Sequence, residues 1–88
     1  MKLKKGMITD SSGGEHIAVA TGEASLVFNG LIRNNETAHF LFRQLMKDTT
    51  EEKLVNSLLA KYEVPADTAK KDVHNFVEKL RKTGLLDE

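Results

Sequence analysis

The chain has 88 residues, 40% of them hydrophobic and 30% charged, a composition that describes one small globular domain, 1–88, and excludes a wholly disordered protein. Thirteen basic and thirteen acidic residues cancel, so the chain lacks the basic excess that is typical of nucleic-acid-binding proteins. It has no cysteine, no apolar run long enough to span a membrane and no signal-peptide stretch in residues 1–5. We therefore expect a cytoplasmic protein with no membrane partner. We also expect residues 1–5 to be flexible.

Two segments in the first third of the chain predict a β-hairpin. Gly6–Ser11 leads into Ser12-Gly13-Gly14, where the glycines favour a turn because they accept positive φ angles at little steric cost. Glu15–Ala20 follows, with Ile17 and Val19 on one face and small or polar residues on the other. This alternation is typical of a half-buried strand.

A third short strand, Leu31–Arg33, is predicted after the turn dipeptide Asn29-Gly30. The preceding Leu26–Phe28 is compatible with either a separate strand or an irregular arm. If the three predicted strands form a meander, Leu31–Arg33 lies at the edge of the sheet with unpaired backbone N–H and C=O groups. Such an edge can pair with a further strand, although Arg33 can equally serve only to protect an edge that is left in water.

The remaining two thirds of the chain predict three amphipathic helices. Asn34 or Asn35 can cap the first helix, and the capping-box spacing of Thr49–Glu52 starts the second. Pro65 suits the first turn of the third helix, and Gly84 is typical of a helix end. Three strands followed by three helices make a single α+β domain. The apolar stripes comprise Ala38, Leu41, Phe42 and Leu45, then Leu54, Val55, Leu58, Leu59 and Tyr62, then Ala69, Val73, Phe76, Val77 and Leu80.

The polar residues do not indicate catalysis. His16, His39 and His74 fall on three different predicted elements, without the short spacing of metal ligands. Glu51-Glu52 is explained by its place in the first turn of a helix, where acidic side chains complement the helix dipole. No serine lies in a nucleophile motif, and no phosphate-binding glycine loop is present. We therefore predict that the protein is not an enzyme and holds neither a metal nor another cofactor.

An exposed strand beside the third helix would form a groove. One wall would offer backbone hydrogen bonds and the other apolar pockets, an arrangement that captures extended peptides. The third helix carries Lys70, Lys71 and His74 beside its apolar stripe, although such a run is also typical of a solvated helix face. The pattern therefore favours a binding domain for another polypeptide.

Three segments of the chain resemble motifs of the coenzyme PQQ synthesis protein D (PqqD) family. Asn35-Glu36-Thr37-Ala38 resembles the Leu-Asn-Glu-(Ser/Thr)-Ala element that opens the first helix of that family, with Asn34 in place of the leucine. Thr50–Val55 is similar to the start of its second helix. Asp72–Leu80, followed by Gly84-Leu85-Leu86, resembles its DVxxFLxxLxxxGL ending. The similarity spans nearly the whole chain and implies a winged-helix-like fold with a three-stranded antiparallel sheet followed by three helices.

The resemblance implies a peptide chaperone. Members of the family bind the leader of a ribosomally made precursor peptide and present it to a modifying enzyme, often a radical SAM protein. The leader adds as a strand beside the third strand and packs against the third helix. Relatives serve PQQ and other modified peptides, so the resemblance does not identify the precursor or the enzyme. The implied peptide-binding residues are Leu31, Ile32, Arg33 and Asn34 on the strand, with Lys70, Val73, His74 and Val77 on the helix.

Two other functions are compatible with the sequence. A DNA-binding winged helix shares the predicted architecture, but zero net charge and a third helix of mixed charge disfavour nucleic acid as the partner. A homodimerising assembly module would pair the exposed edge with that of a second copy. A salt titration against duplex DNA tests the first alternative, and concentration-dependent sedimentation tests the second.

Overall fold

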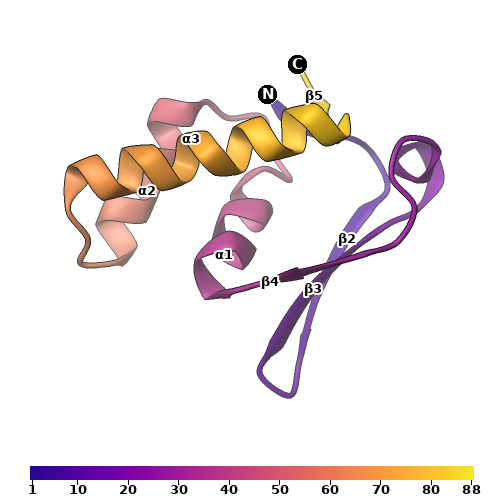
Figure 1. Cartoon of the computed structure of the whole chain (residues 1–88), viewed down its shortest axis with the longest axis horizontal. Coiled ribbons are helices and arrows are strands. Elements are labelled where there is room, and N and C mark those ends of the chain that lie inside the picture. The colour runs from indigo at the N-terminus through magenta and orange to yellow at the C-terminus, as the bar shows by residue number, and fades with distance from the viewer.

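The computed structural model describes residues 1–88 and contains the α+β fold that the sequence predicts. A three-stranded antiparallel sheet comes first and three helices follow it. Figure 1 shows the helices gathered on one side of the molecule, with the hairpin of the first two sheet strands projecting away from them. The sheet consists of β2 (Met7–Ser12), β3 (Glu15–Ala20) and β4 (Leu31–Asn34), and the helices are α1 (Glu36–Gln44), α2 (Glu51–Lys61) and α3 (Ala66–Thr83).

The helix boundaries follow from the capping residues. The Asn35 side chain accepts a hydrogen bond from the Ala38 backbone N–H at 2.8 Å, so Asn35 rather than Asn34 caps α1. Thr50 caps α2 in the same way. Pro65 precedes the first residue of α3, and Gly84 ends this helix with a φ of 81°, which is strained for any residue with a side chain.

The segment between β3 and β4 is not a strand. A short 3-10 helix, η1 (Gly22–Leu26), occupies it, which resolves the two readings of Leu26–Phe28 in favour of an irregular arm. Ala24 is fully buried, and its N–H donates to the Lys5 carbonyl at 3.0 Å. One small buried side chain therefore anchors the arm, while Leu26 beside it is 84% exposed.

The two ends of the chain pair with each other. Strand β1 (Lys2–Leu3) runs antiparallel to β5 (Leu86–Asp87), Leu3 is only 5% exposed, and the N-terminal ammonium donates to Asp48 at 2.7 Å. The structure therefore places residues 2–3 in a strand and not in the flexible arm that we expected. A two-residue strand contains no repeat of hydrophobicity, so the sequence pattern carries no signal for it.

The core is a single cluster to which the helices contribute most side chains. All fifteen buried residues are hydrophobic. Ala18 is the only β3 member and is fully buried, which fixes the face of the sheet that packs on the helices. None of the helices combines the length and the hydropathy that crossing a bilayer would require.

Candidate functional site

Strand β4 has an unpaired edge. It pairs with β3 on one side, with Ile32 opposite Ala18 and Leu31 opposite Val19, and no strand of the chain pairs with its other side. Because side chains alternate along a strand, Ile32 shares the inner face with buried Ala18, whereas Leu31 and Arg33 lie on the outer face. The backbone of β4 therefore offers hydrogen-bonding groups to an incoming strand.

A groove of about 490 Å³ runs between this edge and α3. Seven of the twelve residues that line it are hydrophobic, so an apolar side chain that enters the groove leaves water. The lining residues are Phe28, Leu31, Ile32, Arg33, Asn34, Asn35, Ala38 and Phe42 before α3, and Phe76, Lys79, Leu80 and Thr83 on α3.

Two phenylalanine rings form part of the floor of the groove. Phe42 and Leu80 are buried members of the core, whereas Phe76 is only partly buried. The rings of Phe42 and Phe76 meet edge to face, with centroids 5.4 Å apart and planes at 77°. This geometry is the favourable one for aromatic pairs, so the core holds Phe76 in place from below while its upper side remains available.

The rim of the groove is positively charged. Arg33 and Lys79 are its only charged residues, both are exposed, and neither forms an ion pair. By contrast, Arg81 near the end of α3 is held by the carboxylates of Glu78 and Glu88. The side-chain amide nitrogen of Asn34 is buried and has no hydrogen-bond partner within the chain. The groove thus combines an apolar floor with two free cations in a protein of zero net charge.

The structure places the predicted strand residues in the groove and the predicted helix residues outside it. Leu31, Ile32, Arg33 and Asn34 all line the groove. Val73 and Val77 are 0% exposed within the core, and Lys70 and His74 lie on the flank of α3 that faces α2. The helix residues that the resemblance implies therefore lie away from the flank of α3 that borders β4.

The α3 residues that border the groove have a helical signature that sequence reasoning missed. Phe76, Lys79, Leu80 and Thr83 are spaced i, i+3, i+4 and i+7, so they share one face of the helix. The apolar pattern of the sequence places Phe76 and Leu80 in the inward stripe and gives Lys79 and Thr83 no role in a site. The period of the pattern was available in the sequence, but the rotation of α3 relative to β4 was not.

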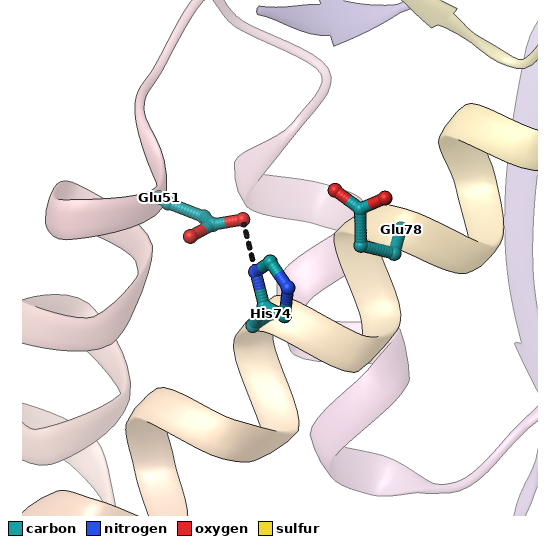
Figure 2. A group of neighbouring side chains, drawn as sticks. All are labelled: Glu51, His74 and Glu78. Carbon is teal, nitrogen blue, oxygen red and sulfur yellow. Dashed lines mark hydrogen bonds and ion pairs between the residues drawn. The ribbon is translucent and has the colours of Figure 1, made fainter.

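His74 takes part in a surface cluster between α2 and α3. Figure 2 shows the Glu51 carboxylate reaching from the start of α2 to the His74 ring, with a distance of 3.2 Å between Glu51 Oε1 and His74 Nδ1. Glu78 is near both, and the ligand-type atoms of the three residues lie within 4.8 Å of one another, as in a metal site. However, Glu78 already pairs with Arg81, and Lys70 lines the same hollow as Glu51 and His74. The Glu51–His74 contact links the two helices and the Glu78–Arg81 pair lies within α3, and contacts between such solvent-accessible side chains contribute little to stability.

The structure also brings together two histidines that the sequence left apart. The rings of His16 on β3 and His39 on α1 stack with centroids 4.3 Å apart, and the Ser11 hydroxyl lies 2.7 Å from His16 Nδ1 and 3.2 Å from His39 Nε2. Burial is the main cause that lowers the pKa of His39, and the charges of His16, Arg43 and Lys61 lower it further. This polar cluster lies beside β2, away from the β4 groove.

A comparison with protein-family models matches residues 15–86 to coenzyme PQQ synthesis protein D (PqqD). The chain belongs to this family. The matched region begins with β3 and ends within β5, so it contains both walls of the groove. This confirms the relationship to PqqD that the three sequence motifs indicated.

Two solved structures share the fold of this PqqD-family chain. "TbiB1 in complex with the TbiA(beta) leader peptide" is 17% identical, with a TM-score of 0.76 over 99% of this chain and 95% of that one. "Lasso peptide synthetase B1 complexed with the leader peptide" is also 17% identical, with a TM-score of 0.70 over 96% of this chain and 93% of that one. At this identity the likeness establishes the fold. No curated protein sequence matches the chain.

Proposed function

We propose that this PqqD-family protein is a non-catalytic peptide carrier. It binds the leader of a ribosomally made precursor peptide as an additional strand on β4 and presents the peptide to a modifying enzyme, such as a radical SAM protein, in the cytoplasm. The observation that carries the proposal is the unpaired edge of β4 beside an apolar groove. An edge of this kind supplies backbone hydrogen bonds, and the groove supplies side-chain contacts.

The two structural neighbours support a peptide as the ligand. Both are described as complexes with a leader peptide, and both cover almost the whole of this chain. The fold that they share with this protein can therefore hold a peptide of the proposed class. Titration with different precursor leaders distinguishes a PQQ precursor from other modified peptides as the ligand.

The groove is needed because strand pairing alone is too weak. Binding in the micromolar range requires about −8 kcal/mol. Each backbone hydrogen bond contributes only about 0.5–1.5 kcal/mol, and ordering the peptide costs several kcal/mol. At least one apolar side chain of the peptide must therefore be buried, and Phe76 with Leu80 and Ile32 provides the surface for it.

The chemistry of the groove suits a peptide carrier. Its two charged residues are Arg33 and Lys79, and its other lining residues offer apolar surface and neutral polar groups to a peptide. The DNA-binding alternative gains no support, because the free cations flank an apolar floor and Arg81 is neutralised by two glutamates.

An NMR titration tests the proposal. The ¹⁵N-labelled protein is titrated with the leader of a precursor peptide encoded beside its gene. We expect the shift changes to concentrate in the segments 28–35 and 76–83, which contain most of the residues that line the groove. Changes centred on Lys70 and His74, or no changes with any neighbouring precursor, would exclude the groove as the binding site. Sedimentation of the free protein in parallel detects self-pairing of the edge, which would compete with the peptide.

A further inference from the structure

Two rows of side chains cross the outer face of the sheet and end at the open edge. The first row is apolar and consists of Ile8, Val19 and Leu31, which lie opposite one another in the register of β2, β3 and β4. Ile8 is 55% exposed and Leu31 is 50% exposed, so the helices leave this row uncovered. Neighbours of this kind stabilise each other across strands, and the row would gain from one more apolar member beyond Leu31.

The second row ends in a charge. Asp10 on β2 lies opposite Ile17 on β3, and Ile17 lies opposite Arg33 on β4. Arg33 is exposed at the edge of the sheet and forms no ion pair, because Ile17 separates it from Asp10. A strand added to β4 would place one of its side chains directly opposite Arg33, where an opposite charge is favourable and a like charge is not.

The two rows predict which residue types a peptide strand paired with β4 should carry at successive positions. Side chains alternate, so the peptide residues opposite Arg33 and Leu31 both lie on the outer face and are two positions apart. The residue between them lies opposite Ile32 and points to the inner face, toward Phe76 and Leu80. All pairings in this sheet are antiparallel, which is the more stable arrangement. Read from its N-terminus, an antiparallel peptide strand faces Arg33 first and Leu31 two residues later.

We propose that the peptide bound by this protein carries an acidic residue followed directly by two apolar residues. The acidic residue pairs with Arg33, the first apolar residue enters the groove over Phe76, and the second extends the exposed row beyond Leu31. Lys79 on the opposite rim adds a second positive charge, so acidic residues near the motif also favour association. The inference rests on the proposed strand addition and gives it a specific chemical class of ligand.

Selection from a peptide library tests the pattern without knowledge of the natural ligand. The full chain is used to select from a displayed library of peptides that is randomised at seven consecutive positions. We expect enrichment of Asp or Glu followed by two residues from the set Leu, Ile, Val and Phe. Reversing the charge of the selected acidic residue to Lys should weaken binding about fivefold, the size expected for an exposed cross-strand charge pair.

A reciprocal variant and a matched control complete the test. Arg33→Glu should reverse the preference, so that the Lys peptide binds better than the acidic one. Lys71→Glu makes the same charge change at an exposed α3 position outside the groove and should leave the preference unchanged. An unchanged preference in Arg33→Glu, or selected peptides without an acidic residue, would overturn the inference.

The outcomes also separate this inference from the proposed function. Selected peptides that shift the NMR signals of the groove but lack the acidic residue would leave strand addition standing and remove the pattern. Peptides with the two apolar residues in front of the acidic one would show a parallel strand and overturn the stated order. Failure to select any peptide that binds at the groove would count against both proposals together.

Discussion

The two edges of the sheet differ in what lies beside them. Strands β2 and β4 each pair with β3 alone, so both have one side without a partner strand. Beside β4, seven of the twelve lining residues of the groove are hydrophobic. Beside β2, none of the five residues lining the adjacent hollow is hydrophobic, and they include His39 and Arg43 of α1. Two similar backbone edges therefore have different surroundings.

This difference shows that a free edge alone does not make a peptide-binding site. Both edges offer backbone hydrogen-bonding groups, although the Ser11 N–H on β2 already donates to Asp10, and exchanging such bonds with water yields little net free energy. Apolar surface next to the edge decides which of the two can retain a peptide. The polar hollow beside β2 therefore provides an internal control for the groove beside β4.

The largest effect is expected from a substitution at Val77, which lies in the core and not in the groove. Val77 was implied as a peptide contact, yet it is fully buried. Val77→Asp places a carboxylate in the core without a partner, which should cost at least about 3 kcal/mol and unfold much of the protein. Circular dichroism at 25 °C measures the loss of helix. A folded variant that has lost only peptide binding would return Val77 to the binding surface.

The residues on α3 show how much of this site can be predicted from the sequence. The strands, a cap at Asn34 or Asn35 and the stripe Ala69–Val73–Val77 follow from local patterns, and the structure confirms them, with Asn35 as the cap. The capping-box spacing of Thr49–Glu52 predicts the start of α2, but Thr50 and not Thr49 is the residue that caps it. The sequence does not specify which flank of α3 borders β4, because that depends on how the whole helix packs against α1 and α2. It also gave no sign of β1, whose stability comes from pairing with β5 at the other end of the chain.

The next largest effect concerns the apolar floor that distinguishes the two edges. Phe76→Ala removes the aromatic surface of the β4 groove, so peptide affinity should fall about tenfold to hundredfold, as expected for the loss of a large apolar contact. The partly buried ring also contacts Phe42, so stability should fall by about 2 kcal/mol. Fluorescence anisotropy measures the affinity, and urea unfolding confirms that the variant is folded.

The matched change beside β2 is Arg43→Ala. Arg43 is exposed and lines the polar hollow, so its loss should leave peptide affinity unchanged. Equal losses of affinity in the two variants would mean that the peptide does not distinguish the two edges.

A smaller effect is expected from a pair of substitutions in one apolar row. Ile8 on β2 and Leu31 on β4 are similarly exposed and lie on the same face of the sheet. Leu31→Asp should weaken peptide binding about fivefold, because the residue that faces position 31 loses an apolar neighbour. Ile8→Asp should have no effect on binding, and both variants should stay within about 0.5 kcal/mol of the parent stability. Isothermal titration calorimetry measures both affinities; a greater loss for Ile8→Asp would assign the peptide to β2.

The smallest expected effect is a dependence of stability on pH that comes from His39 beside β2 and not from the groove beside β4. Burial, and then the charges of His16, Arg43 and Lys61, lower the pKa of His39 below the ordinary 6.5. The unfolded chain therefore binds a proton at this residue more readily than the folded protein does. Stability should fall as the pH decreases through 6.5, and the decline should end below the lowered pKa. In the His39→Gln variant, the midpoint of urea unfolding should depend less on pH between 7.5 and 5 than in the parent. The groove beside β4 contains no histidine, so peptide affinity should change little over the same pH range.

If the midpoint depends equally on pH in parent and variant, His39 is not the cause of this pH dependence. A parallel loss of peptide affinity on acidification would show that the two edges are coupled.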